Sequence, residues 1–189
     1  MSSLLLSTFI VFLAEMGDKT QLIALLLAAR FQKPAPIISG ILCATLCNHF
    51  IAGLGGMWLS HWLQPPLMQK IVAILFFLMG IWMLVPDKVE KYSFEKPGSN
   101  IFLLTLITFF LAEIGDKTQI ATLTLAAHYQ ALYSVVIGTT LGMLLADIPA
   151  VYIGSSFAKK LPLSALNKIA ACLFIFLGML SIYSGVHYN

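Results

Sequence analysis

Two short stretches of the chain carry nearly the same set of chemically active residues. Residues 15–21 read EMGDKTQ, and residues 113–119 read EIGDKTQ. Each stretch lies in the middle of a long apolar run. Ionisable side chains near the centre of a membrane span are costly, and they usually face a bundle interior or an aqueous cavity. The two stretches, called the motifs below, therefore predict a functional site inside a membrane.

The motifs are rich in oxygen ligands. On a continuous helix, Glu15 and Asp18 would share one face because they are three residues apart. The same holds for the second copy. Hard divalent cations such as Mn2+ and Ca2+ prefer such oxygen ligands. Four acids and two lysines together give a formal charge of −2, which suits one divalent ion. The predicted metal ligands are Glu15, Asp18, Gln21, Glu113, Asp116 and Gln119.

Other polar residues near the motifs have supporting roles in this interpretation. Gly17 and Gly115 could permit close helix approach, local unwinding or exposure of a backbone carbonyl. Asp147 is the only other acid in an apolar segment. The predicted supporting or proton-coupling residues are Lys19, Thr20, Lys117, Thr118, Asp147 and Asn48. A salt bridge of purely structural role within each motif is the alternative, but two carboxylates per lysine leave an excess of acid.

The carboxylates also suggest how transport could be coupled to protons. Clustered acids in a low-dielectric site resist ionisation and hold protons when no cation is bound. A site that holds either a metal or protons is the minimum requirement for antiport. The sequence shows no catalytic cluster of nucleophile and base, so an enzyme is not predicted. No resident cofactor is predicted either, because Mn2+ or Ca2+ would be the transported substrate.

The composition predicts an all-α membrane protein. The chain has 189 residues, of which 59% are hydrophobic and 10% charged, whereas soluble domains carry about 25% charged residues. A span needs about 20 apolar residues. Six segments meet this requirement, at residues 3–29, 36–62, 68–86, 100–127, 132–158 and 164–186.

The chain is an internal duplication with a constant offset of 98 residues. Residues 15–32 and 113–130 are identical at 11 of 18 positions. The predicted domains are a first three-helix repeat at 1–86, a cytoplasmic linker at 87–99 and a second repeat at 100–189. An odd number of helices per repeat inverts the second copy in the membrane. Inverted repeats commonly place a transporter's binding site at their interface, near the membrane midplane.

The basic residues predict the orientation of this multi-pass protein. Eight lysines and arginines follow the first, third and fifth segments, and one lies on the opposite side. The positive-inside rule then places the odd-numbered loops in the cytoplasm and both termini outside. The net charge of +3 reflects this orientation, so no nucleic-acid partner is predicted. The predicted partners are a divalent metal ion, protons and the lipid bilayer, and the oligomeric state is left open.

The paired Glu-x-Gly-Asp-Lys-Thr sequences resemble the hallmark of the Golgi-type calcium/manganese cation–proton antiporter family. This resemblance implies that the motif acids, Glu15, Asp18, Glu113 and Asp116, are cation ligands. The short loops are similar to the bacterial branch, which implies manganese export across the inner membrane by alternating access. The residues alone do not separate Mn2+ from Ca2+. An exporter of small organic solutes and a passive cation channel stay open as alternatives.

Overall fold

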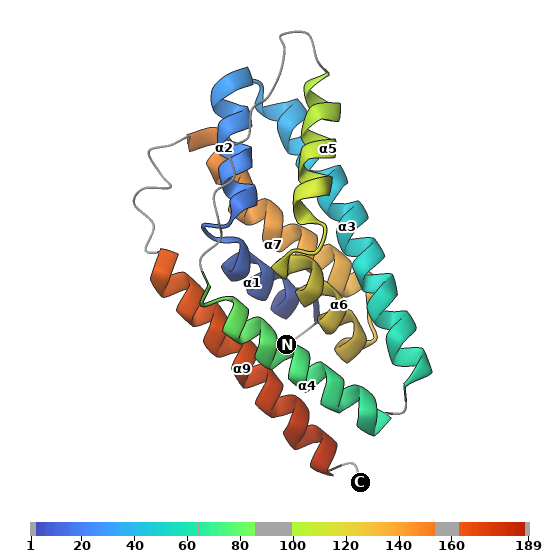
Figure 1. Cartoon of the computed structure of the whole chain (residues 1–189). Coiled ribbons are helices and arrows are strands. Elements are labelled where there is room, and N and C mark those ends of the chain that lie inside the picture. The colour runs from blue at the N-terminus through green and yellow to red at the C-terminus, as the bar shows by residue number, and fades with distance from the viewer. Residues whose placement is uncertain (1–2, 64, 86–99, 154–162, 188–189) are drawn as a thin grey trace.

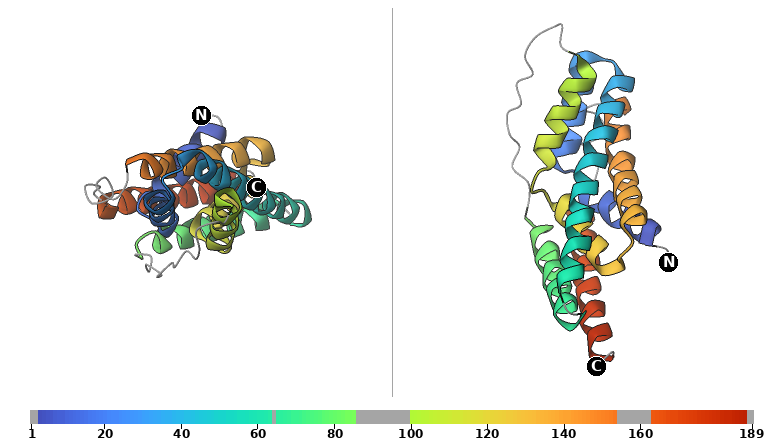
Figure 2. Two further views of the ribbon diagram at one scale, coloured as in Figure 1. Left: turned by 90° about the horizontal axis from the view of Figure 1, so that it is seen from above. Right: turned by 90° about the vertical axis from the view of Figure 1, so that its right-hand side faces the viewer.

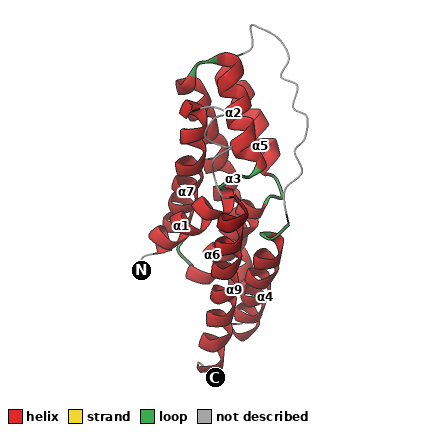
Figure 3. Cartoon of the chain, turned by 90° about the vertical axis from the view of Figure 1, so that its left-hand side faces the viewer, coloured by secondary structure: helices red, strands yellow, loops and turns green. Residues whose placement is uncertain are grey.

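The computed structural model describes residues 3–63, 65–85, 100–153 and 163–187. Every regular element in these ranges is a helix, as Figure 1 and Figure 3 show. The elements are α1 (Ser3–Glu15), α2 (Lys19–Phe31), α3 (Pro34–Trp62), α4 (Pro65–Trp82), α5 (Ile101–Glu113), α6 (Lys117–Tyr129), α7 (Leu132–Ile153) and α9 (Leu163–His187). The all-helical prediction is confirmed for this part of the chain.

Both motifs interrupt a helix. α1 ends at Glu15 and α2 begins at Lys19, while α5 ends at Glu113 and α6 begins at Lys117. Gly17 and Gly115 adopt φ values of 84° and 73°, a region that glycine enters without the penalty of a Cβ atom. The prediction of one continuous helix through residues 3–29, and another through 100–127, is therefore wrong. Each is a pair of half-helices, because the glycine turn ends the first and starts the second.

The remaining segments follow the predicted pattern with shifted ends. α3 and residues 132–152 of α7 are long and apolar enough to cross a membrane. A half-helix of 13 residues is only about 20 Å long at 1.5 Å per residue, so crossing about 30 Å of hydrocarbon needs two in succession. The predicted linker at 87–99 and the end of the predicted fifth segment at 154–158 lie outside the described residues.

The helix before each motif packs against a helix of the other repeat. α1 packs along α7 and α5 packs along α3, so each helix that precedes a motif rests on the long helix of the other repeat. α4 and α9 pack against each other, with the rings of Phe76 and Phe174 at 6.2 Å. In Figure 1 and Figure 2, α2 and α5 lie at one end of the molecule and the α4–α9 pair at the other. The two motif breaks lie between these ends.

A glycine at the α3–α6 contact offers a test of this packing. A Cβ atom at Gly56 would collide with the carbonyl oxygen of Leu123, whereas one at the neighbouring Gly55 would make only ordinary contact with the Leu123 side chain. Overpacking a tight contact costs about 1–3 kcal/mol. We expect Gly56→Ala to lower the thermal unfolding midpoint of the detergent-solubilised protein clearly. Gly55→Ala is the matched control, and equal midpoints for the two variants would contradict the packing.

Candidate metal centre

The helix breaks place the motif acids at helix ends inside the protein. Glu15 is the last residue of α1, and Asp18 occupies the position just before α2. Glu113 and Asp116 hold the matching places between α5 and α6. All four carboxylates are buried. The explanation that a three-residue spacing aligns the acids along one helix face is wrong, because the glycine turn separates them onto different half-helices.

Three of these acids form one compact cluster. Glu15, Asp18 and Asp116 each offer a carboxylate oxygen, and these oxygens all lie within 4.8 Å of one another. Oxygen ligands about 2.3 Å from a Ca2+-sized cation can be at most about 4.6 Å apart. The cluster, which combines both motifs, is therefore close to the size of a coordination sphere. Glu113, the remaining motif acid, does not belong to it.

The motif lysines connect the two repeats. Lys19 Nζ lies 3.4 Å from Asp116 Oδ1, and Lys117 Nζ lies 3.9 Å from Asp18 Oδ1. Both ion pairs thus join one motif to the other. The Lys117 side chain is 2% exposed and that of Lys19 is 26% exposed. Lys117 Nζ also donates to the carbonyl oxygen of Val85 at 3.4 Å. Lys117 is therefore the more deeply buried of the two lysines, and the backbone holds it in addition to its ion pair.

The motif glutamines stabilise the breaks. Gln21 Oε1 accepts a hydrogen bond from the Gly17 N–H at 2.9 Å, and Gln119 Oε1 accepts one from Gly115 at 2.7 Å. The amide oxygens predicted as metal ligands are thus bonded to the backbone of their own turns. The hydroxyls of Thr20 and Thr118 are buried and have no hydrogen-bond partner among the described residues. They stay candidates for the supporting role that the sequence predicts.

Glu113 is held by donors from α3. Thr45 Oγ1 donates to its Oε1 at 3.0 Å, and Asn48 Nδ2 donates to its Oε2 at 3.4 Å. Asn48 was predicted as a supporting residue, and Thr45 was not. The available signal was its position one helical turn before Asn48 in an otherwise apolar segment, which places both residues on one face.

Asp147 is a fifth buried carboxylate. It is completely buried on α7, and neither of its oxygens has a hydrogen-bond partner in the described parts of the chain. It lies close enough to Glu15 and Glu113 for its charge to act on both. The structure therefore brings this predicted supporting residue into the neighbourhood of the motifs.

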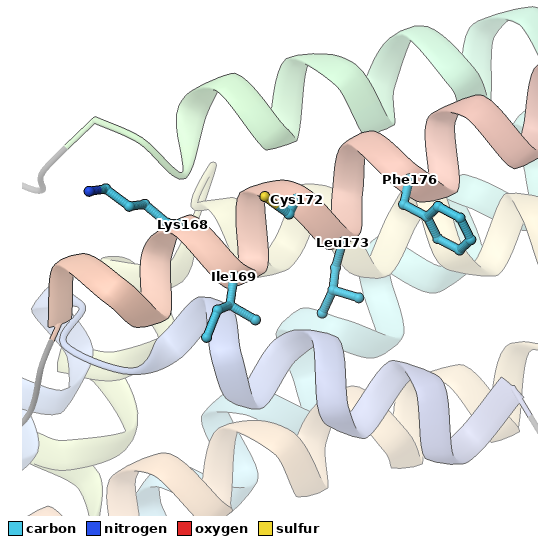
Figure 4. Close-up of a pocket in the computed structure, with 5 residues that line it drawn as sticks. All are labelled: Lys168, Ile169, Cys172, Leu173 and Phe176. Atoms are coloured by element: carbon cyan, nitrogen blue, oxygen red, sulfur yellow. The ribbon is translucent and has the colours of Figure 1, made fainter.

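A surface groove of about 410 Å³ lies elsewhere, on α9. Figure 4 shows the five residues that line it, Lys168, Ile169, Cys172, Leu173 and Phe176. None of the predicted ligands contributes to this groove, and it contains no acid. A divalent cation needs oxygen ligands, so the candidate centre is the carboxylate cluster and not the groove.

The sequence profile of one family matches the chain twice. The family is described as the divalent cation/proton antiporter GDT1, and the matches cover residues 3–91 and 101–189. The chain belongs to the GDT1 family. It is thus an integral membrane transporter and not an enzyme. Its family exchanges divalent cations for protons, chemistry for which buried carboxylates are suited.

Individual relatives agree with this assignment. A Vibrio cholerae protein named "Putative manganese exporter" is 47% identical over 181 residues, which cover 95% of this chain and 90% of the relative. The GDT1-like protein 4 of Oryza sativa subsp. indica is 29% identical over 89% of this chain and 69% of its own length. The GDT1-like protein 5 of Arabidopsis thaliana is 26% identical over 95% of both chains. No solved structure matches the chain significantly.

Proposed function

We propose that the protein exports Mn2+ from the cytoplasm in exchange for protons. The observation that carries this proposal is the cluster of Glu15, Asp18 and Asp116, in which carboxylate oxygens from both motifs lie within 4.8 Å of one another. The similarity to a relative named as a manganese exporter supports Mn2+ as the substrate. Ca2+ takes the same oxygen ligands and is the second candidate cation.

The proposed architecture is a pair of inverted three-helix repeats. In this arrangement α1 with α2 forms one span and α5 with α6 another, which gives six spans in total. The repeats would occupy residues 1–86 and 100–189, joined by a cytoplasmic linker at 87–99, with both termini outside the bacterial inner membrane. Broken helices that meet at a buried ion site are a recurrent feature of secondary transporters. The breaks at Gly17 and Gly115 are consistent with it.

The proposed coupling is competition for one site. Two lysines neutralise part of the charge of the buried acids. The remaining carboxylates need further positive charge, because unpaired buried charges are costly. Either a divalent cation or protons can supply it. Alternating access at this site would then exchange the two across the membrane.

Transport by purified protein in sealed liposomes tests the proposal. An imposed pH gradient should drive Mn2+ to accumulate above its equilibrium level, with a matching movement of protons reported by a trapped pH dye. A passive channel would only equilibrate Mn2+. Mn2+ flux at full rate without proton movement would contradict the coupling, and absence of Mn2+ flux would contradict the substrate. Parallel assays with Ca2+ and with organic solutes determine the preferred substrate.

A further inference from the structure

The duplicated site is not symmetric beyond the motifs. The offset of 98 pairs Thr45 with Met143 and Asn48 with Ala146. The two donors that bond Glu113 from α3 therefore have apolar counterparts on α7. The pair Thr45 and Met143 even touch, with the hydroxyl 3.5 Å from the sulfur atom. Glu113 thus has neighbours that Glu15, its counterpart in the first motif, lacks.

Glu15 has a different environment. It is completely buried, and neither of its carboxylate oxygens has a hydrogen-bond partner within the described ranges. It belongs to the compact cluster with Asp18 and Asp116. A buried carboxylate without donors is strongly disfavoured unless a cation compensates its charge. The environment of Glu15 therefore points to a bound cation or proton, whereas the carboxylate of Glu113 already accepts two hydrogen bonds.

Asp147 is not one of the three acids of the compact cluster, but it lies close enough to Glu15 for its charge to act on that residue. Its carboxylate is also fully buried and without a hydrogen-bond partner among the residues that the structure covers. Gln21 connects this part of α7 to the first motif, because its amide group accepts from the Gly17 N–H and donates to the carbonyl oxygen of Ala146 at 2.9 Å. The bond holds the residue next to Asp147 beside the break at Gly17.

We propose that the two motif glutamates have different roles, an inference that rests on the proposed function. Glu15 and Asp147 bind the transported cation together with Asp18 and Asp116. Glu113 is a positioning residue: Thr45 and Asn48 fix its carboxylate, and Asn48 also bonds the Phe110 carbonyl oxygen near the end of α5 at 3.0 Å. This anchors the turn from which Asp116 follows.

Mn2+ affinity of the purified protein tests these roles directly. Binding can be followed by the loss of the electron paramagnetic resonance signal of free Mn2+. Glu15→Gln and Asp147→Asn should each raise the Kd at least about tenfold, whereas Glu113→Gln should stay within about threefold. Size-exclusion profiles and unfolding midpoints identify variants that fail to fold. If Glu15→Gln fails to fold, the comparison of Asp147→Asn with Glu113→Gln keeps the test intact.

A second test exchanges the residues beside the two motif glutamates between the repeats. Its result would not change if Glu113 served only to stabilise the fold. The combined substitutions are Thr45→Met, Asn48→Ala, Met143→Thr and Ala146→Asn. They remove the donors from Glu113 and place the same side chains at the corresponding positions of α7, the helix along which α1 packs. In this background, Glu113→Gln should become the more damaging of the two glutamate changes. An unchanged ranking, or equal losses for Glu15→Gln and Glu113→Gln in the parent, would overturn the inference.

The outcomes separate this inference from the proposed function. A parent protein that does not bind Mn2+ would contradict the proposed function, and with it the inference that depends on it. A parent that binds Mn2+ but retains full affinity in Asp147→Asn would contradict only the inference. The position of the cation would then have to be sought among the motif acids alone.

Discussion

Replacing Glu15 with glutamine, or Asp116 with asparagine, is expected to abolish Mn2+ export almost completely. Each change removes one carboxylate charge from a cluster whose ligand atoms lie within 4.8 Å of one another. Both replacements are nearly isosteric, and Asp116→Asn also removes the ion pair with Lys19. The measurement is the Mn2+ content of bacterial cells that express each variant under manganese stress, with the amount of protein in the membrane determined in parallel.

The control for this prediction is a polar side chain far more exposed than the cluster. Tyr133 is 74% exposed at the start of α7, and Tyr133→Phe should export Mn2+ as the parent does. Full export by both acid variants, at normal levels in the membrane, would exclude the cluster as the transport site.

Loss of the buried lysine should destabilise the protein more than loss of its counterpart. Lys117→Met leaves the buried Asp18 without its partner from the second motif, and breaking a buried ion pair costs about 3–5 kcal/mol. Lys19→Met is the matched control. The Lys19 side chain is 26% exposed and only its partner Asp116 is buried, so water can reach the position that the ammonium group of Lys19 leaves. We expect a much lower thermal unfolding midpoint for Lys117→Met.

Both lysine variants can be measured in the same detergent by the same unfolding assay. Equal midpoints would mean that the two lysines are held equivalently, contrary to the asymmetry in their burial. A lower midpoint for Lys19→Met than for Lys117→Met would contradict the assignment of Lys117 as the more deeply held residue.

The sequence predicted the chemistry of the site better than its geometry. The acids within apolar segments predicted a site of four carboxylates from two motifs, because such charges have few other roles. Three of the four, Glu15, Asp18 and Asp116, lie in one cluster. The predicted alignment of Glu15 and Asp18 on one helix face was wrong, because it assumed a regular helix and Gly17 interrupts that helix. Glycine allows several conformations, and the sequence alone did not choose among them.

Contacts between repeats were the least accessible to prediction. Thr45 bonds Glu113 from 68 residues away, and Gln21 bonds Ala146 from 125 residues away. Such bonds depend on which faces of α3 and α7 turn toward the half-helices. The hydrophobic pattern of a uniformly apolar segment does not indicate those faces. Asp147 was recognised because an acid in an apolar segment is conspicuous, whereas Thr45 is not.

Mn2+ titration of the purified protein shows whether the two motifs build one cation site. We expect saturable binding of Mn2+ to the parent. We expect loss of this binding in Asp18→Asn with Asp116→Asn, a double variant that removes one carboxylate from each motif. A double variant that is folded and still binds Mn2+ with the affinity of the parent would contradict a shared site built by the two motifs.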